Sequence, residues 1–230
     1  MALQAMLFDM DGTLTRPMLD FPAIKREIGL PPDSYILEAL EKMTPAERAR
    51  AMVVVERHEE QAARLSELNE GVESLMAALA GRGIRVGLIT RNSRRSVDLV
   101  AGRHGLRFDA CVCRDHAAPK PSPAGILLAL RLLGLEPVGA VYVGDHTIDV
   151  LAGRAAGLRT IWVTNRHELN PRPPADFTVT SPTGIIPLLD ELQATNESGA
   201  RPYRLRIAVD PYKADNGRVR FVEPLLQESP

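Results

Sequence analysis

The stretch Ala5-Met-Leu-Phe-Asp9-Met-Asp11-Gly-Thr-Leu-Thr15, near the start of a chain of 230 residues, decides the fold. Its four apolar residues, Ala5–Phe8, predict a short buried strand, and two acids separated by one residue follow directly. Because side chains alternate along an extended backbone, both carboxylates can face one cleft, and Gly12 lets the chain turn away there. Carboxylates this close repel one another unless a cation neutralises them, and oxygen ligands favour a hard cation such as Mg²⁺.

Outward from this stretch, short apolar runs alternate with helical patterns for most of the chain. The further expected strands are Ile84–Ile89, Phe108–Cys113, Ala140–Val143, Thr160–Val163 and Phe177–Val179. The expected helices between them are Gly71–Arg82, Ser93–His104, Pro123–Leu133, Ile148–Ala156 and Pro182–Gln193. This alternation predicts an α/β fold with a doubly wound, mostly parallel sheet.

One interval interrupts the alternation between the first two expected strands. From Arg16 to Leu68 there is no strand-like run, only helical patterns near Phe21–Ile28, Ser34–Lys42 and Pro45–Leu65. A small all-helical cap inserted into the core is therefore expected. We divide the chain into an α/β core (residues 1–15 and 69–193), a helical cap (16–68) and a linker with a C-terminal extension (194–230).

The extension has the pattern of a β-hairpin. Apolar residues alternate with arginines from Tyr203 to Val209, Asp215-Asn-Gly217 supplies turn chemistry, and an apolar run ending at Val222 follows. An isolated hairpin is unstable unless it packs on something, so a homodimer that uses this hairpin is an open alternative.

Composition limits the classes of partner. The chain has 28 Lys+Arg against 29 Asp+Glu, a net charge of -1, so we expect neither nucleic acid nor a membrane as a partner. The start lacks the basic region of a secretory signal, and no apolar run approaches the roughly 20 residues of a membrane span. Cys111 and Cys113 are expected to be buried free thiols, and a cytoplasmic setting follows as the default.

Polar side chains follow three other expected strands. Thr90 ends the second strand, Lys120 follows the third, and Asp145 ends the fourth. In an open α/β sheet ligands bind outside the carboxyl ends of the strands, so these groups are expected to share a site with the two acids after the first strand. Acids that hold a divalent cation, one hydroxyl and one fixed ammonium together suit a phosphoryl group during in-line displacement.

These residues resemble the four motifs of the haloacid dehalogenase superfamily, in order. The motifs are Asp9-Met-Asp-Gly-Thr13, Thr90, Lys120 and Gly144-Asp145-x-x-x-Asp149, and the match extends from residue 1 to about 193. The helical insertion is similar to the cap of the phosphoglycolate phosphatase-like branch. The resemblance implies a Mg²⁺-dependent phosphatase that hydrolyses a small phosphorylated metabolite through an aspartyl-phosphate.

The resemblance also implies a role for each motif residue. Asp9 would be the nucleophile and a metal ligand, and Asp11 would be the general acid and base, with its carbonyl as a further metal ligand. Thr90 and Lys120 would hold phosphoryl oxygens. Asp145 would complete the metal shell, and Asp149 would be an outer metal ligand or orient Lys120.

Substrate choice is expected to lie with the cap and the loops it covers. Arg91 and Asn92 beside Thr90, and Arg16, Lys25 and Arg26 near the first hinge, are candidates to bind the substrate. The arginines and Lys25 are candidates to meet a second anionic group such as a carboxylate.

Three alternatives to a phosphatase stay open. The same fold is used by mutases that transfer the phosphoryl group. Phosphonate hydrolases also share it, and these would need a cap lysine such as Lys25 or Lys42. The third alternative is a binding or interaction protein without turnover.

Overall fold

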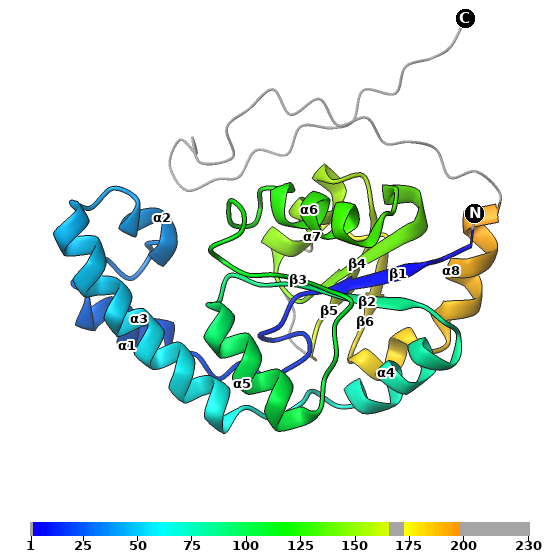
Figure 1. Cartoon of the computed structure of the whole chain (residues 1–230), viewed down its shortest axis with the longest axis horizontal. Coiled ribbons are helices and arrows are strands. Elements are labelled where there is room, and N and C mark those ends of the chain that lie inside the picture. Colours follow the sequence, from blue (N-terminus) through cyan, green and yellow to red (C-terminus); the bar gives the residue numbers. More distant parts are fainter. Residues whose placement is uncertain (1, 166–172, 198–230) are drawn as a thin grey trace, which may run out of the picture.

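The computed structural model describes residues 2–165 and 173–197, which form a parallel sheet covered by helices on both faces. The strands are β1 (Ala5–Phe8), β2 (Arg85–Ile89), β3 (Ala110–Val112), β4 (Ala140–Gly144), β5 (Arg159–Val163) and β6 (Phe177–Val179). Their order is β3-β2-β1-β4-β5-β6, and each neighbouring pair is parallel (Figure 1). The predicted α/β fold with a doubly wound sheet is therefore confirmed for the described part of the chain.

The two faces of the sheet bury separate apolar clusters because successive strand residues point to opposite sides. On β1, Met6 and Phe8 join one cluster, while Ala5 and Leu7 join the other. Helices α4 (Val72–Gly81), α5 (Arg94–His104) and α8 (Leu188–Glu197) cover the first face. Helices α6 (Ala124–Leu133) and α7 (Thr147–Ala155) cover the second (Figure 1). The central strands β1 and β4 are buried on both faces, and this explains why their sequences are continuously apolar.

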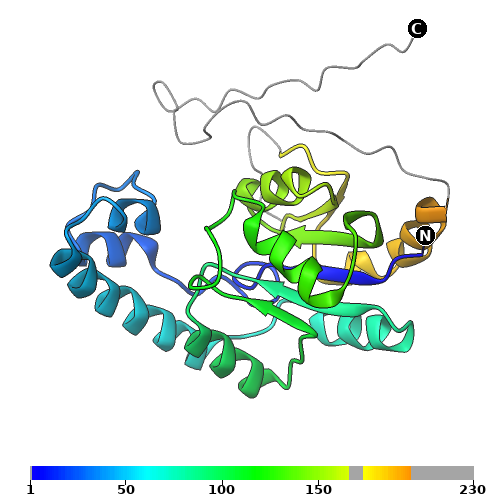
Figure 2. The ribbon, with the colours of Figure 1, turned by 45° about the horizontal axis from the view of Figure 1, so that its top comes forward.

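Three helices lie together to one side of the sheet and form the element that we call the helical cap (Figures 1 and 2). They are α1 (Phe21–Glu27), α2 (Ile36–Leu40) and α3 (Pro45–Leu65). The start of α3 is a capping box: the Thr44 hydroxyl accepts from the Glu47 N–H, and the Glu47 carboxylate accepts from the Thr44 N–H. The cap buries a small apolar cluster of its own, so it is held together by more than its attachment to the core.

One predicted helix is divided in the structure. The expected helix Pro182–Gln193 is a 3₁₀ turn, η2 (Pro182–Ile185), followed by α8. Pro187, directly before α8, has no N–H to donate and its ring clashes with a preceding helical turn, so an uninterrupted helix cannot pass through it. A second 3₁₀ turn, η1 (Pro137–Gly139), leads into β4. The predicted C-terminal hairpin lies outside the described residues.

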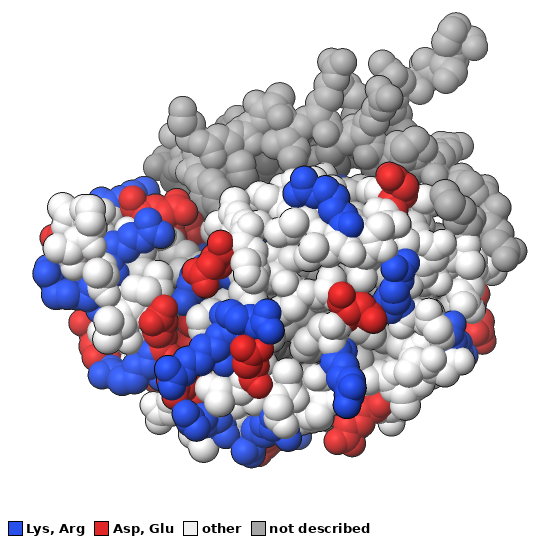
Figure 3. Space-filling view, viewed as in Figure 1, with Lys and Arg blue, Asp and Glu red and all other residues white. Residues whose placement is uncertain are grey.

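The cysteines are free thiols as predicted, and the predicted burial is complete for one of them. Cys113 is buried and Cys111 is half-buried; both are free thiols, with their Sγ atoms 3.6 Å apart. Over the cap and α5, positive and negative side chains intermingle on the face shown in Figure 3. Within the described residues, no helix is both long enough and apolar enough to cross a membrane.

Candidate active site

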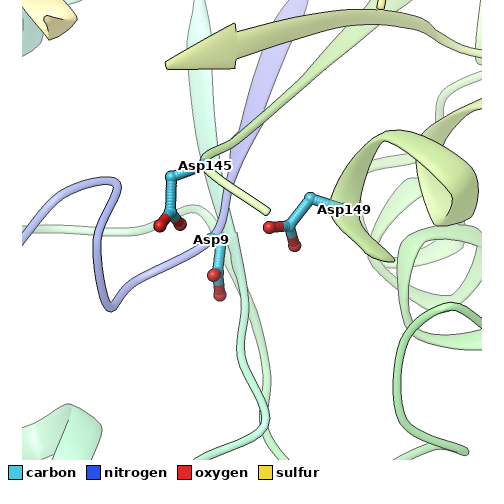
Figure 4. A group of neighbouring side chains, drawn as sticks. All are labelled: Asp9, Asp145 and Asp149. Atoms are coloured by element: carbon cyan, nitrogen blue, oxygen red, sulfur yellow. The ribbon is translucent and has the colours of Figure 1, made fainter. Parts of the chain in front are cut away.

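Three carboxylates converge at the carboxyl edge of the sheet. Asp9 follows β1 and Asp145 follows β4, and these strands are neighbours with Phe8 beside Val143. Asp149 comes from the first turn of α7. One oxygen from each acid lies within 4.8 Å of the others, and the three side chains point toward one another (Figure 4).

Lys120 is the cation at the centre of this group. Its Nζ lies 2.6 Å from Asp9 Oδ1 and 2.7 Å from Asp149 Oδ1, and it donates to the Ile89 carbonyl at 3.3 Å. The residue is only 3% exposed. Burial alone would lower the pKa of Lys120, but the charges of Asp149 and Asp9 raise it well above its ordinary value. The two carboxylates therefore favour the charged form of this buried lysine.

The surroundings of Asp9 and Asp145 raise the pKa values of both carboxyl groups. Burial raises the pKa of Asp9 to about 7, although Lys120 opposes the shift. Burial raises the pKa of Asp145 to about 8, and the neighbouring acids Asp149 and Asp9 add to the effect. Half-buried carboxylates with raised pKa values fit the site of a hard divalent cation, which would favour their ionised forms.

Asp145 and Asp149 have different hydrogen-bond partners. Asp145 Oδ1 accepts from the Thr13 hydroxyl at 3.1 Å. Asp149 Oδ1 accepts from Lys120 and, at 3.4 Å, from the Tyr142 hydroxyl, while its Oδ2 accepts from the His146 N–H at 3.0 Å. Both oxygens of Asp149 are thus engaged by the protein.

Gly12 allows the loop after β1 to reach Asp145. Its φ is +82°, and a Cβ there would lie 2.1 Å from Asp145 Oδ2. Any other residue would combine backbone strain with a clash against the carboxylate. The glycine is therefore required by both the turn and the close approach.

Asn69 holds the same loop and was not anticipated from the sequence. Its Nδ2 donates to the carbonyls of Gly12, Thr13 and Thr15 at 2.9, 3.0 and 3.1 Å. Its pattern in sequence is only that of a polar residue before a helix, which gives no indication of this role.

Asp11 occupies a separate corner of the site. Its Oδ2 accepts from Asn92 Nδ2 at 2.6 Å, and burial raises its pKa although the Asn92 hydrogen bond opposes this. Thr90, 5% exposed, accepts from the Asn92 N–H at 3.1 Å and lines the same cavity. Asp9 thus lies beside a lysine, whereas Asp11 lies beside an amide.

A cavity of about 380 Å³ connects these groups to the cap. The core supplies Asp9, Asp11, Thr90, Lys120, Asp145 and Asp149, and the cap supplies mainly apolar side chains. Arg91, Asn92 and Lys25 also line it. The sheet edge and the cap therefore enclose one space.

The candidate substrate-binding residues are not all placed in this cavity. Arg16 forms an ion pair with Glu67, Nη1 to Oε2 at 3.0 Å, and its side chain is 59% exposed. Neither Arg16 nor Arg26 is among the described residues that line the cavity. Sequence proximity to the hinge does not fix the direction of a long side chain, so these two residues are not brought to the site.

The raised pKa values lead to a prediction for the metal-free protein. Between the ordinary value of 3.8 and the folded values of about 7 and 8, Asp9 and Asp145 bind more protons in the folded state than in the unfolded state. The free energy of unfolding should therefore fall as pH rises through this window. In EDTA we expect a lower Tm at pH 8 than at pH 6.5, and Mg²⁺ should raise the Tm more at pH 8.

Scanning calorimetry at pH 6.5 and pH 8, with and without Mg²⁺, measures these Tm values. The matched control is Asp145→Asn, which should reduce both the pH dependence and the response to Mg²⁺. His146, whose pKa burial lowers, acts in the opposite direction but below its ordinary value of 6.5. A Tm in EDTA that rises from pH 6.5 to 8 would contradict the prediction.

The fold and the site define a class of protein. It is an α/β protein with a parallel sheet whose carboxyl edge carries a cluster of acids paired with a buried lysine. The sequence profile of the haloacid dehalogenase-like hydrolases matches residues 22–163. The chain belongs to this family, which confirms the resemblance found in its motifs.

Individual relatives agree with this assignment. N-acetylmuramic acid 6-phosphate phosphatase of Pseudomonas aeruginosa is 33% identical over 220 residues, which cover 83% of this chain and 96% of that enzyme. Phosphoglycolate phosphatase of Synechococcus elongatus is 27% identical and covers 83% of this chain and 99% of its own. Among solved structures, CbbY from Rhodobacter sphaeroides in complex with phosphate has 25% identity and a TM-score of 0.63, covering 80% of this chain and 96% of its own.

A more distant structure shows a shared fold alone. The phosphonoacetaldehyde hydrolase like protein from Oleispira antarctica has a TM-score of 0.70 at 15% identity and covers 88% of this chain and 96% of its own.

Proposed function

We propose that this protein is a Mg²⁺-dependent phosphatase that hydrolyses a small phosphomonoester through an aspartyl-phosphate on Asp9. The observation that carries the proposal is the separation of two carboxyl groups into different environments, Asp9 beside Lys120 and Asp11 beside Asn92. Carboxyl groups in unlike environments can serve as nucleophile and as acid and base in one reaction. Curated relatives named as phosphatases support the same conclusion.

In the first step an Asp9 oxygen attacks phosphorus, the bond from phosphorus to the ester oxygen breaks, and Asp11 gives its proton to the departing alkoxide. Burial raises the pKa of Asp11, which favours the protonated form that this step needs. In the second step Asp11 takes a proton from water, whose oxygen attacks phosphorus. Inorganic phosphate leaves and the Asp9 carboxylate is restored.

Mg²⁺, when bound, supplies positive charge to the transferring phosphoryl group. Asp9, Asp145 and the Asp11 carbonyl would hold it. Both Asp149 oxygens already accept hydrogen bonds, which favours a role for Asp149 in orienting Lys120 over direct binding of the metal. Thr90 and Lys120 would hold phosphoryl oxygens, and Lys120 brings a fixed charge to them.

The alternatives receive less support from the described contacts. Lys25, a lysine that a phosphonate hydrolase would need for a Schiff base, lines the cavity but donates to the Pro32 carbonyl at 2.6 Å. Lys42 is not among the described lining residues. Homodimerisation and a cytoplasmic setting stay predictions from the sequence.

The test is hydrolysis of an aryl phosphate in Mg²⁺ combined with detection of the phosphoenzyme. EDTA should abolish turnover and excess Mg²⁺ should restore it. An acid quench during turnover of ³²P-labelled 4-nitrophenyl phosphate should leave label on the protein that hydroxylamine releases, as an acyl phosphate does. Full turnover in EDTA, or burst kinetics with no labelled protein, would contradict the proposal.

A further inference from the structure

An ion pair joins the cap to the core beside the cavity, where Arg91 is one of the lining residues. Arg91 Nη2 lies 2.6 and 2.7 Å from the two carboxylate oxygens of Glu38, a residue of α2 in the cap. Arg91 Nη1 also donates to the Lys120 carbonyl at 3.3 Å. The side chains of Arg91 and Glu38 are only 21% and 14% exposed. The Arg91 charge is therefore neutralised within the protein, in a place with little access to water.

Of the other cations that line the cavity, Lys120 is paired with carboxylates, whereas Lys25 has a carbonyl partner and keeps its charge. The lysine and arginine side chains among its described lining residues are Lys25, Arg91 and Lys120. Lys120 is bound by Asp9 and Asp149, and Lys25 donates to the Pro32 carbonyl. Among the described lining residues, the arginine that could meet a leaving group beyond the phosphoryl site is Arg91, and its charge is already paired with Glu38.

The cap side of the cavity is mainly apolar. Its described lining includes Leu19, Phe21, Ile24, Tyr35, Leu37 and Val55. Phe21 and Tyr35 are 50% and 56% exposed, so aromatic surface is available to a ligand that enters between cap and core.

Glu59 of the cap also lines the cavity, and it is paired with an arginine of the core. Glu59 of α3 accepts from Arg114 Nη1 and, at 3.2 Å, from the Ser93 N–H. Arg114 donates in turn to the Arg91 carbonyl at 3.3 Å. The backbone that carries Arg91 is thus linked to the cap through Arg114 as well as through the Glu38 ion pair.

We propose that Glu38 is a specificity-determining residue: by holding Arg91 it makes the cavity select phosphomonoesters whose leaving group is uncharged and partly apolar. This inference rests on the proposed phosphatase function. It separates the protein from its relatives named for phosphoglycolate, a substrate with a carboxylate next to the phosphoester. A carboxylate near Arg91 would have to displace the Glu38 carboxylate or be buried beside it, and both are unfavourable.

Matched pairs of substrates measure this selection. Phosphoglycolate and phosphoglycolamide are one pair, and 4-carboxyphenyl and 4-carbamoylphenyl phosphate are a second pair with a longer reach. In the wild type we expect kcat/KM for each carboxylate to be at most about one tenth of that for its amide, the size of one charge-assisted contact. In Glu38→Gln this ratio should rise about tenfold or more through a lower KM for the carboxylates, because Arg91 is released.

Two variants isolate the effect. Glu41→Gln removes an exposed acid just after α2 and should leave the ratio unchanged. The double variant Glu38→Gln with Arg91→Gln should lose the gain. If the ion pair only fastens the cap to the core, Glu38→Gln would slow all four substrates alike, and the unchanged ratio would overturn the proposal. A wild-type ratio of one or more would do the same.

Binding separates this inference from the proposed function. In the Asp9→Asn protein with Mg²⁺, calorimetry gives dissociation constants for phosphoglycolate and phosphoglycolamide without turnover. A preference for the amide that Glu38→Gln reverses supports the role of Glu38 even where hydrolysis fails. Equal affinities in both backgrounds would overturn it even where hydrolysis is fast.

Discussion

Replacing Asp9 with asparagine should reduce turnover of 4-nitrophenyl phosphate in Mg²⁺ by roughly 10⁴-fold or more, the scale seen when a covalent nucleophile is removed. The amide has nearly the shape of the carboxylate but is a poor nucleophile, and it cannot form the acyl phosphate. Labelled phosphoenzyme should be absent in the same variant. Phosphate release at saturating substrate, together with the acid-quench assay, measures both effects.

Asp98→Asn is the matched control because Asp98 is an exposed acid on α5 whose partner is Arg94. It should keep wild-type turnover. Thermal unfolding of both variants shows whether the fold persists. An Asp9→Asn protein that is folded and still turns over within tenfold of wild type would exclude Asp9 as the nucleophile.

Replacing Lys120 with methionine should lower kcat/KM by about 10²- to 10³-fold, the scale for loss of one charged group that stabilises the transition state. Lys120 lowers the pKa of Asp9, against the rise to about 7 that burial and the nearby acids produce. Without the ammonium that pKa rises further, and more of the Asp9 carboxyl is protonated at neutral pH. The acid limb of the pH–rate profile should therefore move to higher pH.

The same change should also destabilise the metal-free protein, because Asp9 and Asp149 lose their buried counter-ion. Removing one partner of a buried pair costs about 3–5 kcal/mol, less where the remaining acids take up protons. Urea unfolding in EDTA measures this loss, and Lys42→Met, at an exposed cap lysine, is the control. An acid limb that stays in place would contradict the role of Lys120 in tuning Asp9.

The order of polar residues along the chain was enough to predict which side chains meet at one edge of the sheet. Asp9, Thr90, Lys120 and Asp145 each follow an apolar run, and the carboxyl ends of parallel strands meet at one edge of a sheet. The structure brings these residues together around one cavity. The same rule could not place Arg16, because a long side chain on an irregular segment takes its direction from whichever acid is near, here Glu67.

The sequence by itself determined the α/β fold and the position of the acids and the lysine along it, because hydrophobic period and turn chemistry are local properties. Only the tertiary structure decided that Arg91 is bound by Glu38, 53 positions away, and that Asn69 holds the loop after β1. The tertiary structure also brings hydrogen-bond donors to both carboxylate oxygens of Asp149. Such pairings arise where the packing of cap and core brings distant polar groups out of water, and no local pattern encodes which partners meet there.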